Sequence, residues 1–256
     1  MRTCACLTVF VFVFWMLPGM SLGQHEGLIG YWDFNEEDDG EVAEDTSGMG
    51  NHGTLVGDIK RVESRPGFGQ ALELSVPGSH LRIEHSDIFN LQEFTMALWF
   101  KSEAEQEDWG KIICKQKVPG YPFSIQFDDS NRIKVEIGLA AGGNVTLPER
   151  IPNPNDWAHM TLVSDGENAT LYLNGERFST AQLGGDLLHN GEPITIGSRV
   201  DSSQNFSGLI DDVRIYTRAL EQEEIALAMN SEIRMAVSPS GTLIGTWAGL
   251  KQFSSR

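Results

Sequence analysis

The chain has 256 residues and a formal net charge of −17 at pH 7, with 19 Lys and Arg against 36 Asp and Glu. Such an excess of negative charge disfavours nucleic acid and anionic lipid as partners and favours divalent cations. A chain of this length is sufficient for one large β domain.

The first 23 residues are predicted to be a signal peptide. Arg2 precedes an apolar run from Leu7 to Leu17, and the small residues Ser21 and Gly23 suit a signal peptidase. The alternative is an uncleaved anchor, but a membrane span needs roughly 20 apolar residues and no other run is apolar enough. We therefore expect a secreted protein, extracellular or periplasmic, without membrane insertion.

Cleavage would remove Cys4 and Cys6 and leave Cys114 as the only cysteine. Loss of Arg2 would change the net charge from −17 to −18. Without an internal disulfide, the domain is expected to depend on its core or on a bound ion. Cys114 itself is interpreted as a small buried apolar residue and not as a nucleophile.

Alternating apolar residues predict about eleven strands between residues 28 and 216, separated by Gly, Asn, Asp or Pro. They read LIGYWDF, ALEL, HLRIEH, FTMALWFKS, KIICKQ, FSIQF, RIKVEIG, AHMTLVSD, ATLYLNGERF, PITIGS and LIDDVRIY. The pattern indicates an all-β fold, a two-sheet antiparallel jelly-roll sandwich.

Three features complete the predicted domain, which covers residues 24–230. Asn174-Gly175 is a strong hairpin signal. LEQEEIALAMN predicts one short C-terminal helix that packs Ile225 and Met229 on the rim of the sandwich. Residues 231–256, rich in Ser, Gly and Thr, are predicted to be an extension, either poorly ordered or a loose strand.

An acidic, glycine-rich segment, EDTSGMGNHGTLVGD at residues 44–58, has the composition of a cation-binding loop. Calcium prefers oxygen ligands, and glycines would let the backbone curl around the ion. The oxygen atoms that could converge come from Asp33, Asp45, Ser47, Asn51 and Gly53. The alternative is a turn rich in Asp and Asn without an ion.

Catalysis is not expected. Glu36, Asp38 and Glu41 match the E-x-D-x-x-E pattern of glucan-cleaving enzymes, but acidic residues and a glycine lie between them. In those hydrolases the acids alternate with apolar residues on a strand, which also raises the pKa of one carboxylate. This triplet is instead interpreted as a solvated turn.

The order of the segments GLIGYWDFNE, AEDTSGMGNHGTL, DWAHMTLVSDGENATLYLNG and GLIDDVRIYTRAL resembles the concanavalin A-like laminin-G/pentraxin superfamily, in its bacterial-style laminin-G form. The resemblance covers about residues 27–230. It implies a jelly roll of two curved sheets, usually one structural calcium, and frequent sugar or protein binding. Adjacent first and last strands in that family would bring Asp211 or Asp212 to the calcium.

The alternation of residues along LIDDVRIY predicts which face of the strand each of these two acids occupies. Leu209, Val213 and Ile215 would form the core face, which makes Asp211 the acid at greater risk of burial and turns Asp212 outward. Alternation alone does not choose the ligand. The family pattern favours Asp212 as the sixth member of the calcium site.

Trp99 and Trp157 are interpreted as core residues packed between the sheets, and His159 as a structural histidine. Rings on predicted loops are better candidates for stacking on carbohydrate or a glycoprotein: Trp109, Tyr121 and Phe206. Each could instead be an anchor folded onto the sandwich edge.

A non-catalytic carbohydrate-binding module is therefore the leading hypothesis, and a structural or adhesive protein-protein interaction domain is the alternative. Exposure of Trp109 and Tyr121 on one side of the domain favours sugar, whereas burial favours the alternative. N-x-Ser/Thr glycosylation patterns occur at Asn144, Asn168 and Asn205.

Overall fold

The computed structural model describes residues 26–37, 40–116, 121–150 and 153–230. The predicted signal peptide, the extension at 231–256 and Asp38 lie outside this part. The described strands are β1 (Leu28–Trp32), β2 (Val42–Ala43), β3 (Gly53–Val56), β4 (Lys60–Glu63), β5 (Gln70–Glu73), β6 (His80–Ile83), β7 (Glu93–Ser102), β8 (Lys111–Lys115), β9 (Phe123–Phe127), β10 (Ile133–Gly138), β11 (Asn144–Arg150), β12 (Ala158–Asp165), β13 (Asn168–Leu173), β14 (Glu176–Gln182), β15 (Ile194–Ile196) and β16 (Gly208–Tyr216).

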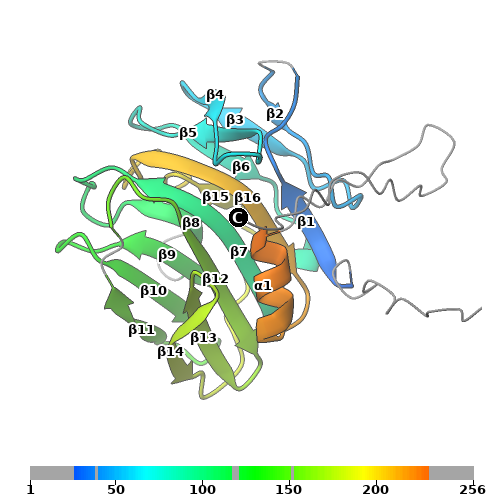
Figure 1. Cartoon of the computed structure of the whole chain (residues 1–256). Helices are drawn as coiled ribbons and strands as arrows, with labels where there is room; N and C mark the ends of the chain where they lie inside the picture. Colours follow the sequence, from blue (N-terminus) through cyan, green and yellow to red (C-terminus); the bar gives the residue numbers. More distant parts are fainter. Residues whose placement is uncertain (1–25, 38–39, 117–120, 151–152, 231–256) are drawn as a thin grey trace, which may run out of the picture.

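The strands form two antiparallel sheets, as predicted for a jelly-roll sandwich (Figure 1). Sheet A has the order β14-β13-β12-β7-β16-β5-β4, and β1 also pairs with β16. Sheet B has the order β11-β10-β9-β8-β15-β6-β3-β2. One hydrophobic core joins their inner faces and includes Trp32, Phe100 and Phe127, each no more than 1% exposed.

Strand β16 is interrupted by a bulge that changes which side chains face the core. Asp211 lies opposite Trp99 of β7, but the next paired residue is Arg214, opposite Ala97. Asp212 has φ of 52°, a conformation that bulky L-residues seldom adopt. Because of the extra residue, alternation does not continue through the strand.

The alternation-based prediction for this strand was therefore wrong in part. Ile210 faces the core together with Val213 and Ile215, whereas Leu209 is half-buried. Both acids of the bulge are buried, Asp211 at 0% and Asp212 at 4% exposure. The bulge also divides the edge of β16, since β5 pairs with Leu209 and Ile210 while β1 pairs with the second half.

Helix α1 (Gln222–Asn230) confirms the predicted C-terminal helix but not its packing on the rim. It lies on the outer face of sheet A, beside β7 and β1 in Figure 1. Ile225 is buried there with Tyr31 and Tyr216, and Ala228 is the second buried residue of the helix, whereas Met229 is half-buried.

The Asn-Gly hairpin is confirmed between β13 and β14, where Asn174 and Gly175 have φ values of 51° and 77°. These values are those of the two-residue turn that such a pair favours. Among the helices of the described residues, none is both long and apolar enough to cross a membrane.

Candidate functional site

The segment predicted to bind calcium covers the second edge of β1, whose other edge pairs with β16. Thr46 donates its backbone N–H to the Tyr31 carbonyl at 2.8 Å, and the Asn51 side chain donates to the Ile29 carbonyl at 2.6 Å. The Trp32 indole donates to the Asn51 carbonyl at 3.0 Å. The loop thus satisfies polar groups that an open strand edge would leave unpaired.

Asp45 is the centre of this loop. Its carboxylate accepts backbone N–H groups from Tyr31 at 2.9 Å, Ser47 at 2.9 Å and Asn51 at 2.8 Å. Gly48 and Gly50 have φ values of 87° and 76°, as expected for a curled loop.

The other proposed ligands have separate contacts. Ser47 Oγ accepts from the backbone of Met49 at 3.3 Å, and Asp33 accepts from the backbone of Asn35 at 3.4 Å. Burial raises the pKa of Asp33. Gly53 belongs to β3, where a Cβ would lie 2.4 Å from Leu81 Cδ1, so the glycine is needed for packing.

Asp212 lies in a different cluster, centred on Arg65 from the turn between β4 and β5. Arg65 donates to Asp212 at 2.5 Å and to Asp211 at 3.0 Å. Ser64 Oγ also donates to Asp211 at 2.5 Å. The two carboxylates of the bulge therefore share one guanidinium from the same chain.

These contacts do not fit one calcium site formed by the predicted ligands. Asp45 is surrounded by backbone donors, whereas Asp212 faces Arg65 and, at 3.4 Å, Arg214, both of which repel a cation. The described residues contain no group of three or more His, Cys, Asp or Glu side chains that could hold a metal. Calcium binding itself stays a prediction, but the ion shared by Asp45 and Asp212 is not supported.

The ionic cluster continues under α1. Tyr31 donates its hydroxyl to Asp212 at 2.7 Å and accepts from Arg214 at 3.0 Å. Arg214 donates to the carbonyl of Ala228, and the Trp99 indole donates to that of Met229 at 3.3 Å. A cation at the C-terminal end of a helix is favourable, so the cluster attaches α1 to the sheet.

His159 is a buried neighbour of the cluster, with its ring centre 5.2 Å from that of Trp99. Its Nε2 has no hydrogen-bond partner within the described part of the chain. Burial, with Arg214 and Arg65 nearby, lowers its pKa from 6.5 to about 3. The pKa of Asp211 shifts in the opposite direction, because burial and the charge of Asp212 raise it from 3.8 to about 7.

His159→Phe is expected to reduce the acid sensitivity of folding. Between pH 6.5 and about 3, the unfolded state binds a proton at His159 that the folded state does not, so wild-type stability falls as pH falls. Asp211 acts in the opposite direction between pH 3.8 and about 7, but it is present in both proteins. Urea unfolding at several pH values should show the variant gaining relative stability in acid. Parallel profiles would contradict this assignment.

Trp99 and Trp157 do not pack in the core as predicted. Trp99 alternates with Leu98 and Phe100, which face inward, and therefore points to the outer face of sheet A. Both tryptophans are half-buried. With Phe68 they surround the Arg65 guanidinium, whose carbon lies 4.1 Å from the centre of Phe68, 4.3 Å from that of Trp99 and 5.3 Å from that of Trp157.

Trp109 and Tyr121 lie on the outer face of sheet B. Trp109 has φ of 64° and holds its ring 4.9 Å from Lys134 Nζ. Lys134 pairs with Glu136 at 3.0 Å, and Glu136 is hydrogen-bonded to Tyr121, whose pKa is raised by burial and by Glu136. Tyr121 also accepts from Asn144 at 2.9 Å. The two half-buried rings therefore share one face, and the polar row formed by Lys134 and Glu136 lies between them.

The same face carries polar residues that strand alternation places opposite the core. Gln126 donates to Glu136 at 3.1 Å, and Lys111 donates to Gln126. Burial lowers the pKa of Lys111 to about 8. Cys114 is fully buried here, as predicted, 3.3 Å from Thr195 Oγ1.

Phe206 does not present its ring to a ligand, which contradicts its prediction as a stacking residue. It is 1% exposed and stacks on Phe127, with ring centres 6.2 Å apart and an interplanar angle of 20°. The apolar ring of Phe206 is buried inside the sandwich. Phe206 is therefore an anchor at the sandwich edge, as the alternative interpretation expected.

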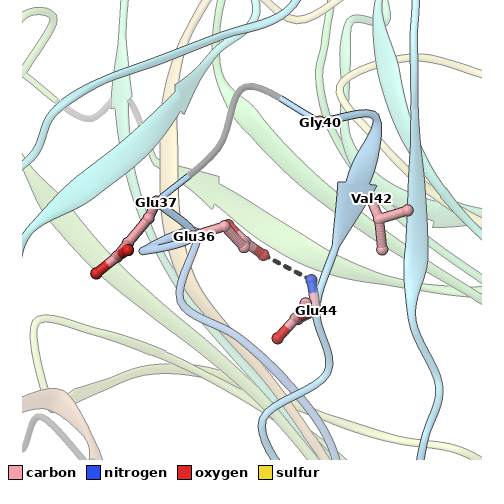
Figure 2. Close-up of a pocket in the computed structure, with 5 residues that line it drawn as sticks. All are labelled: Glu36, Glu37, Gly40, Val42 and Glu44. Carbon is pink, nitrogen blue, oxygen red and sulfur yellow. Dashed lines mark hydrogen bonds between the residues drawn. The ribbon is translucent and has the colours of Figure 1, made fainter.

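The described residues also line an acidic pocket of about 730 Å³, formed by Glu36, Glu37, Gly40, Val42 and Glu44. Figure 2 shows Glu36 reaching toward the backbone N–H of Glu44, a contact of 2.6 Å. Glu36 also pairs with Arg61 at 3.0 Å. With no aromatic ring among these residues and Glu36 already neutralised, this pocket lacks the stacking surface expected for sugar.

The glycosylation patterns differ in accessibility. Asn144 is exposed, whereas Asn168 and Asn205 are half-buried. The Asn205 amide donates to Glu107 at 2.6 Å, so a glycan there would break a formed contact. Glycosylation stays a prediction.

Comparison with known proteins places this geometry in a family. The model described as the concanavalin A-like lectin/glucanases superfamily matches residues 76–226, more than half of the chain. Adhesion G-protein coupled receptor V1 from Danio rerio is 27% identical over 145 residues, which are 53% of this chain but 2% of the receptor.

Solved structures share the fold at low sequence identity. Domain 4 of AbnA, a GH43 extracellular arabinanase from Geobacillus stearothermophilus solved with arabinotriose, has a TM-score of 0.62 and 19% identity, covering 78% of this chain and 97% of that domain. The binding domain of botulinum neurotoxin DC in complex with SialylT has a TM-score of 0.66 and 17% identity over 81% of this chain and 52% of that one.

The binding domain of Paraclostridial Mosquitocidal Protein 1 has a TM-score of 0.65 and 17% identity, again over 81% of this chain and 52% of that one. This chain therefore spans about half of each toxin domain and a small part of the receptor. By its match over residues 76–226, the protein belongs to the concanavalin A-like lectin/glucanases superfamily.

Proposed function

We propose that this protein is a non-catalytic carbohydrate-binding module whose ligand lies on the outer face of sheet B, between Trp109 and Tyr121. The observation that carries the proposal is that two half-buried rings share one face with the polar row Lys134–Glu136 between them. Sugars combine apolar ring faces with hydroxyl groups, so stacking rings beside donors and acceptors suit them.

The backbone at Trp109 adds support. A bulky residue at φ of 64° is strained by roughly 1–3 kcal/mol, and such strain persists where a side chain must be held in a particular place. Here it holds the indole over Lys134. The solved relatives with arabinotriose and SialylT support the same ligand class.

Binding without cleavage is supported by the positions of the acids. Glycosidases place two carboxylates across an open groove. The adjacent pair Asp211 and Asp212 is buried beneath Arg65, and Glu36 is paired with Arg61. We further propose that residues 1–23 direct export, so that the module acts outside the cell.

Trp109→Gly is expected to weaken binding at least about tenfold, which corresponds to roughly 1.4 kcal/mol of lost stacking. Glycine adopts positive φ without strain, so the fold should be retained. A glycan array followed by titration calorimetry with arabinotriose, cellohexaose and mannohexaose measures the loss. Trp109→Phe is the control, because it keeps a stacking ring. Equal affinity in wild type and Trp109→Gly, or no glycan bound by wild type, would contradict the proposal.

A further inference from the structure

We propose a second carbohydrate site on the outer face of sheet A, in a groove beside Trp157 that accepts a neutral sugar ring. It uses the ligand class of the proposed function but a different sheet, so the two proposals can fail separately. The groove has a volume of about 210 Å³. Its lining residues are Glu73, Ser75, Lys101, Ser102, Glu103, Asn155, Gly208 and Leu209.

Strand register places this groove next to the tryptophans. Leu209 of β16 lies between Glu73 of β5 and Lys101 of β7. Ala158 pairs with Phe100, so Trp157, one residue earlier on the antiparallel strand, falls opposite Lys101. Trp99 lies two residues along β7 from Lys101, on the same face and about 7 Å away.

The aromatic rings beside the groove, which do not themselves line it, are held in place by Arg65. Arg65 is fixed by Asp211 and Asp212 and contacts the rings of Phe68, Trp99 and Trp157. Since the guanidinium is itself buried, at 6% exposure for the residue, the half-buried rings and not Arg65 form the accessible surface. A ligand that extends from the groove over Trp157 would meet rings that are already ordered and would lose little side-chain entropy.

The lining of the groove has the mixed chemistry that sugar hydroxyls need. Lys101 supplies donors, Glu73 and Glu103 supply acceptors, and Asn155 supplies both. Half-buried Leu209 gives an apolar floor. Two carboxylates against one ammonium make the groove net negative, which favours neutral over acidic sugars.

Two sites on opposite sheets would make one domain bivalent, because each sheet turns its outer face away from the shared core. A single copy could then bridge two glycan chains. The volume near Trp157 suits one sugar ring, so binding is expected at a chain end or a branch. This geometry predicts cross-linking without a second copy of the protein.

The test is binding stoichiometry, measured by titration calorimetry on the full chain with arabinotriose, cellohexaose and mannohexaose, and with sialyllactose as the acidic comparison. Wild type is expected to bind two molecules of a neutral sugar. Trp157→Ala and Trp109→Gly should each bind one, and the double variant none.

Two further variants keep the result interpretable if Trp157→Ala is destabilised. Lys101→Met keeps the aliphatic stem but removes the ammonium, and Asn155→Gly suits φ of 65° while removing the amide. Each should weaken only the second site, with an unchanged unfolding midpoint. One sugar per wild-type chain, lost in Trp109→Gly but kept in all groove variants, would refute the second site and leave the first. No neutral sugar bound by wild type contradicts both.

Discussion

Arg65→Ala is expected to lower the free energy of unfolding by about 3–5 kcal/mol, because it leaves buried Asp211 without its cation and Asp212 with only Arg214, at 3.4 Å. Arg65 contacts Asp211 at 3.0 Å and Asp212 at 2.5 Å. Its side chain is 7% exposed and also packs on the rings of Phe68 and Trp99. Urea unfolding at pH 7.5, followed by tryptophan fluorescence, measures the loss.

Arg82→Ala is the matched control, since it removes an arginine whose pair with Glu84 is much more exposed. Exposed pairs contribute no more than about 1 kcal/mol. Adding Asp211→Asn and Asp212→Asn to Arg65→Ala should recover part of the stability, because the buried charges are then gone. A loss from Arg65→Ala no larger than that from Arg82→Ala would show that the ionic cluster is not buried as described.

Asp45→Ala is expected to cost about 2–4 kcal/mol, because three backbone N–H groups lose their acceptor and an unpaired buried donor costs roughly 1–3 kcal/mol. These donors belong to Tyr31, Ser47 and Asn51, so the loss would also loosen the loop from β1. Thermal and urea unfolding measure the effect.

The calcium prediction is tested in the same experiment. Wild type and Asp45→Ala are each unfolded in millimolar calcium and in EGTA. If the carboxylate acts only as a hydrogen-bond acceptor, the difference between the proteins is the same in both buffers. A difference that vanishes in EGTA would show that Asp45 binds the ion. Asp45→Asn is the control, since its amide oxygen still accepts at least one bond.

The fold was predictable where strands are buried on their inner faces. The sequence indicated the central strands β7 and β12 because inward apolar residues alternate with outward ones, and β16 because apolar residues flank its two acids on both sides. Its pattern did not reveal β2, β3, β4 or β11, and it merged β14 with β13. All of these except β3 lie at the ends of the sheet orders, where an edge strand packs on fewer neighbours and carries more polar residues. Strand β3 was missed because its residues belong to the glycine-rich segment that was interpreted as a cation-binding loop.

The sites were predictable only in part. Trp109 and Tyr121 were selected as aromatic rings on predicted loops; the structure places them on one face, and their role in binding stays a prediction. The contacts of Arg65 were missed, since nothing local connects the turn between β4 and β5 with β16, more than 140 residues later. The available signal was the pair Asp211 and Asp212 in a buried strand, because two adjacent buried acids require cations from elsewhere.

The bulge in β16 has a consequence for how this strand can change in evolution. Three steps along β16, from Asp211 to Arg214, match two steps along β7, from Trp99 to Ala97. Deleting either acid would restore regular pairing and leave Ile210 and Val213 on the core face, but it would remove one of the two carboxylates that Arg65 contacts. Deleting both acids would instead turn one half of the strand inside out, so length changes at this point should be tolerated singly and rejected by twos.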